Sequence, residues 1–135
     1  MNQRMEIHKT ILSILKKNNM QVSVNFIILY GSQITMKASP RSDIDICISA
    51  NAPQKKRFGL RLLLARELPD QYDIQIFEDL PLRLKMSVLK GKLLYCKDKE
   101  KLTDLAIELK KEYEDFLPRY RYYITGIKHA QQSSL

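Results

Sequence analysis

The chain alternates between segments whose hydrophobic residues recur every three to four positions and short segments in which they are contiguous or alternate with polar residues. Helical spacing over residues 3–18 predicts an amphipathic first helix, which ends in basic and turn-forming residues. The apolar run 26–30 predicts a buried strand within 22–30. The alternating run 44–48 predicts a second strand, over 43–49, with one polar and one buried face.

The next segments continue this alternation. Residues 55–67 predict a basic helix, and the alternation over 72–77 predicts a third strand. Asp79 is placed to cap a following helix that has Pro81 in its first turn, and Gly91 ends that helix. The leucines expected to face inward from the basic helix are Leu60, Leu62, Leu63 and Leu64.

The last third of the chain is predominantly helical in pattern. Residues 93–96 predict a short fourth strand, and a long charged helix is expected to run from Asp98 to Phe116. Pro118 is expected to separate that helix from a last helical segment, because proline disrupts a helix interior. Aromatic residues in this region fit either a core-covering helix face or a partner surface: Tyr113, Phe116, Tyr120, Tyr122 and Tyr123.

This order of elements predicts an α/β (α+β) fold, with a small mixed β-sheet flanked by helices. At 135 residues the chain is long enough for one core and too short for two ordinary domains. Within one domain we expect residues 1–97 to form the core and residues 98–135 to form a helical extension packed on it.

Polar residues that carry chemistry stand where two predicted strands meet. Gly31 and Ser32 close the first strand, and Asp43 and Asp45 open the second after ten intervening residues. On a strand, residues i and i+2 share a face about 6.5 to 7 Å apart. Two such carboxylates suit a pair of divalent ions about 3.5 to 4 Å apart, and Mg²⁺ prefers oxygen ligands. Asp73 on the third strand offers a further carboxylate.

Each of these features has an ordinary structural explanation when taken alone. A Gly-Ser pair is usually a turn, an Asp-x-Asp pair is usually a solvated strand face, and Asp70, Glu78 and Asp79 compete with Asp73 in sequence. Strand phase favours Asp73, because Ile74 and Ile76 would then face the core. Glycine lets an N–H approach a ligand, and a helical turn beginning near Ser32 would attract a triphosphate. The ordered combination predicts metal-dependent nucleotide chemistry.

Residues 22–97, with the Gly31-Ser32 turn and the Asp43-x-Asp45 strand, resemble the minimal nucleotidyltransferases of the DNA polymerase beta-like superfamily. The resemblance implies a nucleotidyltransferase fold in which Asp43 and Asp45 hold two Mg²⁺ ions. It further implies that Asp73 ligates one ion and orients the attacking hydroxyl. Gly31 and Ser32 would hold the triphosphate of ATP, the substrate.

The same resemblance implies what the chain acts on. The expected activity is transfer of AMP to a protein hydroxyl, and the expected partner is a HEPN-type toxin, a small helical ribonuclease held in a hetero-oligomer with this chain as its antitoxin. The alternative is a non-catalytic antitoxin or binding module that neutralises its partner by complex formation. Many relatives carry an arginine where Gln33 stands, which concerns nucleotide affinity rather than metal binding. Transfer to a small molecule such as an aminoglycoside is a third possibility.

Composition limits the classes of partner and the cellular location that we expect for this chain. The net charge of +8 suits an acidic partner, but the lysine-rich clusters lack interleaved aromatic residues, which argues against nucleic acid. Cys47 and Cys96 have no metal-ligand spacing and predict buried thiols in a reducing cytosol. No apolar run approaches the ~20 residues of a membrane span, and the N-terminus does not read as a signal peptide. We therefore expect a soluble, cytoplasmic protein.

Overall fold

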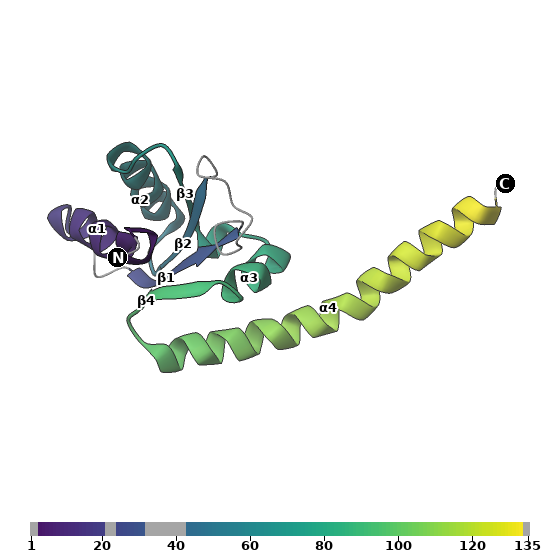
Figure 1. Ribbon diagram of the computed structural model, residues 1–135. Coiled ribbons are helices and arrows are strands. Elements are labelled where there is room, and N and C mark those ends of the chain that lie inside the picture. Colours follow the sequence, from purple (N-terminus) through teal and green to yellow (C-terminus); the bar gives the residue numbers. More distant parts are fainter. Residues whose placement is uncertain (1–2, 21–23, 32–42, 134–135) are drawn as a thin grey trace.

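The predicted mixed α/β architecture is confirmed. The computed structural model describes residues 3–20, 24–31 and 43–133, with side chains described for 6–20, 24–31 and 43–116. The elements follow the predicted order (Figure 1). They are α1 (Gln3–Lys17), β1 (Val24–Tyr30), β2 (Ile44–Ala50), α2 (Gln54–Glu67), β3 (Tyr72–Ile76), the 3-10 turn η3 (Phe77–Asp79), α3 (Leu82–Leu89), β4 (Lys92–Cys96) and α4 (Lys99–Ser133).

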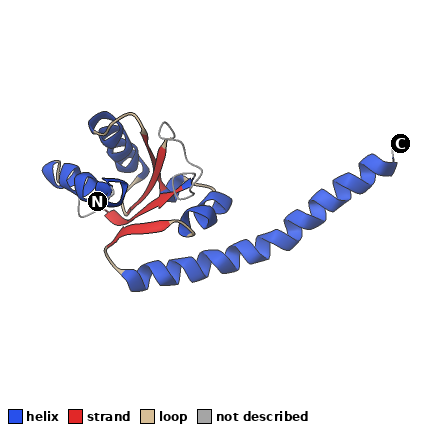
Figure 2. Cartoon of the chain, viewed as in Figure 1, coloured by secondary structure: helices blue, strands red, loops and turns tan. Residues whose placement is uncertain are grey.

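The four strands form one mixed sheet in the order β3-β2-β1-β4 (Figure 2). β1 is antiparallel to both β2 and β4, whereas β2 is parallel to β3. In this register Asp45 lies opposite Tyr30 on one neighbour and opposite Asp73 on the other. The end of β1 and the starts of β2 and β3 therefore meet at one end of the sheet.

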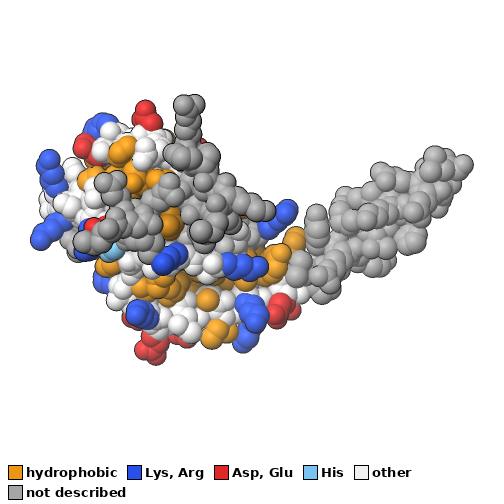
Figure 3. Space-filling model, viewed as in Figure 1, with side chains coloured by type: hydrophobic (Ala, Val, Ile, Leu, Met, Phe, Trp, Pro, Cys, Tyr) orange, Lys and Arg blue, Asp and Glu red, His pale blue; other side chains and the backbone are white. Residues whose placement is uncertain are grey.

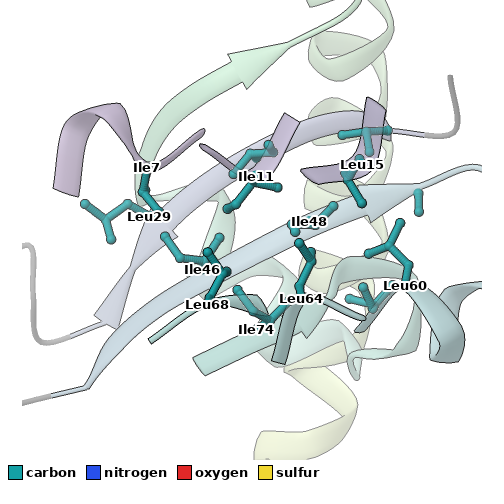
Figure 4. Packing of buried hydrophobic residues seen from close by; sticks show 14 of the residues in the cluster. Ile7, Ile11, Leu15, Leu29, Ile46, Ile48, Leu60, Leu64, Leu68 and Ile74 are labelled. Atoms are coloured by element: carbon teal, nitrogen blue, oxygen red, sulfur yellow. The ribbon is translucent and has the colours of Figure 1, made fainter. Parts of the chain in front are cut away.

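One face of the sheet packs against α1 and α2. The isoleucines of β2 alternate onto this face, as predicted, and Ile46 and Ile48 are fully buried there. Figure 4 shows how helix and strand side chains interdigitate in this cluster. The helices contribute Ile7, Ile11 and Leu15 from α1 and Leu60 and Leu64 from α2. This apolar layer fixes the register of β2, since a slip of one residue would exchange its two faces.

The opposite face carries a smaller core beneath α3 and the first part of α4. Phe26, Ile28 and Cys47 from the strands are buried there with Val88 of α3 and Leu109 of α4. A bulge between Val24 and Phe26 shifts the phase of β1 at its start. α4 runs alongside α3 and then extends away from the sheet (Figure 1).

Three local predictions were wrong. α4 is one helix from Lys99 to Ser133, so Pro118 does not separate two segments. Proline removes only one backbone donor, and the hydrogen bonds of the remaining turns maintain the helix. Leu62 is 54% exposed, because two residues along a helix turn the side chain about 200° away from the Leu60 and Leu64 face. Asp79 does not cap α3, whose N-cap Pro81 has no side-chain cap hydrogen bond.

The thiols and the last aromatic residues fall as follows. Cys47 is buried and Cys96 is half-buried, and both are free cysteines, in line with the expectation of unpaired thiols. Tyr113 is half-buried and Phe116 is exposed, while the other tyrosines of that segment lie outside the described side chains. No helix in the described ranges is both long and apolar enough to cross a membrane.

Two glycines provide a matched test of the packing. A Cβ on Gly91 would lie 2.5 Å from the carbonyl oxygen of Leu29, whereas a Cβ on Gly59 in α2 would meet nothing within 4 Å. We expect Gly91→Ala to lower the free energy of unfolding by about 1–3 kcal/mol, the usual cost of overpacking. Gly59→Ala should raise it by about 0.5–1 kcal/mol through helix propensity. Urea denaturation measures both, and equal effects would contradict the close approach of Gly91 to β1.

Candidate active site

The predicted carboxylates lie together at the end of the sheet where β1 ends and β2 and β3 begin. Asp45 and Asp73 occupy paired positions on the parallel strands β2 and β3. Their side chains share the sheet face opposite α1 and α2, because their neighbours Ile44, Ile46 and Ile74 point into the first core. Asp45 is half-buried and Asp73 is exposed. The alternation that turns the isoleucines of both strands towards the first core is therefore confirmed, but the predicted polar face of β2 is wrong beyond Asp45, because Cys47 and Ser49 are buried as well.

Asp43 stands just outside the strand that was predicted to contain it. β2 begins at Ile44, whose backbone N–H donates to the carbonyl oxygen of Gln71 at 2.7 Å. Asp43 is exposed, yet its charge acts on Asp45. The three aspartates thus form one acidic cluster, with Asp45 at its centre.

The electrostatic state of Asp45 reflects this crowding. Burial raises the pKa of the Asp45 carboxyl, and the negative charges of Asp73 and then Asp43 raise it further. Among the described residues, no positive charge contributes to that shift. These residues leave the ionised form of Asp45 poorly compensated, and a bound cation would relieve the repulsion.

Gly31 fits against the Asp45 carboxylate. Its φ of +81° lies in the left-handed region, and a Cβ built on it would collide with Oδ2 of Asp45. Only glycine satisfies both the backbone angle and the close approach. The other residue of the predicted phosphate-binding pair, Ser32, lies outside the described residues.

The polar neighbour of the Asp73 side chain is Gln75, two residues along the same strand. Gln75 Nε2 lies 3.4 and 3.5 Å from the two carboxylate oxygens of Asp73, which is long for a hydrogen bond. Within the described ranges, no group of three or more acidic, histidine or cysteine side chains is arranged to hold a metal ion.

Tyr30 is part of the same cluster, although its place at the end of the apolar run 26–30 does not predict this. It is half-buried opposite Asp45. Burial, followed by the charges of Cys47, Asp45 and Asp73, raises the pKa of its phenol above the usual range, so the phenol stays protonated. The antiparallel pairing that places it there could not be inferred before the sheet order was known.

Two acidic residues that competed with Asp73 for the third carboxylate position, Glu78 and Asp79, make contacts elsewhere. Glu78 lies near the far end of β2, where it accepts from Ser49 Oγ at 2.5 Å and from the Ala50 N–H at 2.9 Å. This network ties η3 to β2 and satisfies the buried Ser49 hydroxyl. Asp79 accepts from Arg57 Nη2 at 2.7 Å. Strand phase had favoured Asp73 over these two residues, and only Asp73 of the three is in register with Asp45.

The crowding of Asp45 predicts a gain of stability when its charge is removed. A carboxyl whose pKa is raised on folding destabilises the folded chain above that pKa, and the effect is lost as the pH falls below the unfolded pKa. Asp45→Asn should therefore raise the free energy of unfolding at pH 7 in EDTA by about 0.5 kcal/mol, since solvent screens this partly exposed site.

The matched control is Asp70→Asn, at an exposed position outside the cluster. It should leave the free energy of unfolding at the wild-type value at both neutral and acidic pH, because surface substitutions away from such clusters have little effect. Urea denaturation of both variants at neutral and acidic pH measures the difference. Destabilisation by Asp45→Asn at neutral pH would contradict the uncompensated charge.

Comparison with known proteins places this arrangement among nucleotide-transferring enzymes. The family model described as polymerase beta nucleotidyltransferase matches residues 9–100, which include the sheet and all three aspartates. An inferred protein adenylyltransferase of Methanocaldococcus jannaschii is 35% identical over 95 residues, covering 70% of this chain and 74% of that protein.

Solved structures share the fold. A chain of the complex between tri-AMPylated Shewanella oneidensis HEPN toxin and MNT antitoxin is 23% identical, with a TM-score of 0.67, covering 94% of this chain and 98% of that one. A chain of a toxin-antitoxin structure with AMP-PNP is 21% identical, with a TM-score of 0.68, covering 88% and 96%. At this identity the likeness establishes the fold.

Proposed function

Because this chain belongs to the polymerase beta nucleotidyltransferase family, we propose that it transfers AMP from ATP to a hydroxyl group of a HEPN-type toxin and so acts as its antitoxin. The observation that carries the proposal is the in-register pair Asp45 and Asp73, with Gly31 closed against Asp45. Support for a protein acceptor comes from the related adenylyltransferase. Support for the toxin comes from the AMPylated complex that shares this fold.

In this proposal Asp43, Asp45 and Asp73 hold two Mg²⁺ ions. The fit rests on the donor set, three carboxylates of which the central one has a raised pKa that no positive charge of the described residues offsets. Oxygen ligands are what Mg²⁺ requires, and the bound ions would neutralise charge on the phosphates. The N–H groups of the turn at Gly31 and Ser32 would bind the triphosphate.

The chemical step is a displacement at the α-phosphorus of ATP. The acceptor oxygen forms a bond to that phosphorus, the bond to the bridging oxygen of the β-phosphate breaks, and pyrophosphate leaves. Asp73 orients the acceptor hydroxyl and takes its proton, because it is exposed at the edge of the cluster where an acceptor can approach. Most of the rate enhancement would come from positioning and charge neutralisation.

The product explains how such a transfer silences a toxin. AMP adds bulk and a negative phosphodiester to the modified residue, which disfavours a neighbouring phosphate backbone. Figure 3 shows Lys and Arg side chains scattered over the visible face rather than gathered in one patch. The described part of that face therefore lacks the basic stripe that is typical of nucleic-acid-binding proteins. The setting we propose is cytoplasmic.

The test is transfer of label from α-labelled ATP to the HEPN toxin in the presence of Mg²⁺. We expect Asp43→Ala to lower the labelling rate by about 100-fold or more, since removing a group that stabilises transition-state charge typically costs that much. Asp70→Ala, at an exposed aspartate outside the cluster, is the control and should label the toxin at the wild-type rate.

A second assay, of the toxin's ribonuclease activity, separates inhibition by AMP transfer from inhibition by binding alone. The alternative, an antitoxin that acts by complex formation alone, is motivated by Gln33 after the Gly-Ser pair. It requires that the Asp43→Ala/Asp45→Ala double variant still block the toxin's ribonuclease activity at stoichiometric concentration. A wild-type protein that binds and blocks the toxin without labelling it would overturn the proposed transfer.

A further inference from the structure

A groove of about 460 Å³ runs along the free edge of the sheet, between α2 and β3. β3 pairs with β2 on one side only, and in the described part of the chain no strand pairs with its other side. α2 packs beside β3, as Figure 1 shows. We call this feature the β3 groove; it is lined by Gln54, Lys55, Phe58, Arg61, Ile76 and Asp79.

We propose that the β3 groove binds an extended acidic segment of the acceptor polypeptide and directs that polypeptide's hydroxyl towards Asp73. This inference rests on the proposed function, because it assigns the acceptor of that same reaction a docking site. Nothing in the transfer chemistry itself requires the groove, so the two can fail separately.

The charge of the β3 groove favours an acidic occupant. Lys55 and Arg61 line it, and within the described residues no carboxylate lies at ion-pair distance from either cation. Asp79 is the acidic residue of the lining, and Arg57 already offsets it through the 2.7 Å ion pair. The groove therefore presents a net positive charge to a ligand, and steering by such charge favours an acidic segment.

The groove also offers an apolar contact. Phe58 is 58% exposed, although an aromatic ring gains much by burial, and Ile76 also lines the groove. A bound segment would cover the ring. Single-stranded nucleic acid is disfavoured, because it stacks on several aromatic side chains and Phe58 is the aromatic residue of this lining.

The groove lies on the α2 face of the sheet, and Arg61 connects it with the part of β3 that carries Asp73. Arg61 Nε donates at 3.0 Å to the carbonyl oxygen of Ile74, the residue after Asp73, so its guanidinium lies at the free edge of β3. Ile76, which lines the groove, lies three residues beyond Asp73, about 10 Å along an extended strand, and the two side chains point to opposite faces of the sheet. A segment of four to six residues that leaves the groove and passes around the free edge of β3 is long enough to bring the next residue to Asp73.

The test compares neighbouring positions on the same helix. Lys55→Glu changes a residue that lines the groove, whereas Lys56→Glu changes an exposed neighbour that does not. Both substitutions place a glutamate in the first turn of α2, so their effects on the helix dipole match. Phe58→Ala is likewise paired with Leu84→Ala, an exposed hydrophobic residue on α3.

We expect Lys55→Glu and Phe58→Ala each to raise the KM for the toxin about tenfold, which corresponds to about 1.4 kcal/mol. The value of kcat and the KM for ATP should stay at the wild-type values. Lys56→Glu and Leu84→Ala should leave all three constants unchanged. An acidic peptide taken from around the modified hydroxyl should inhibit the wild-type protein competitively and the Lys55→Glu variant about tenfold more weakly.

The outcomes distinguish the two proposals. Normal labelling by Lys55→Glu and Phe58→Ala would overturn the groove and leave the transfer activity standing. No labelling by the wild-type protein would overturn the transfer activity and, with it, the groove. Competition by a single-stranded RNA that Lys55→Glu abolishes would overturn a polypeptide occupant.

Discussion

The parallel pairing of β2 with β3 holds Asp45 beside Asp73, and the rest of the structure depends on that register. β2 lies between β1 and β3, with isoleucines on one face and Asp45, Cys47 and Ser49 on the other. The helices α1 and α2 bury the isoleucine face completely. A slip of one residue would place aspartate in that core at a cost of several kcal/mol, so the apolar layer enforces the acidic cluster.

The acidic cluster trades stability for chemistry. Partial burial and two neighbouring negative charges oppose ionisation of Asp45, and no positive charge in the described part of the chain offsets them. Gly31 adds a left-handed backbone angle at the same point. Such features persist where the surrounding packing determines them and where a ligand gains from them.

The free edge of β3 and the β3 groove are the features on which the proposed docking of a partner depends. The edge of β3 is covered on one flank by α2, and Arg61 occupies one of its free carbonyl groups, which limits uncontrolled strand pairing. The lining of the β3 groove is positive at the side nearest Asp73. Docking at the free edge of β3 and catalysis at the end of the sheet would therefore both involve β3.

Much of this protein follows from its sequence, because the alternation of isoleucine with aspartate over 44–48 and the order of helices and strands are local properties. They were sufficient for the mixed α/β class, the shared face of Asp45 and Asp73, and the choice of Asp73 over Glu78. The tertiary structure decided what depends on contacts between distant segments. Strand order placed Tyr30 opposite Asp45, and packing between α2 and β3 formed the groove. It also showed an unbroken α4, since the strength of a helix depends on all its turns and not on Pro118 alone.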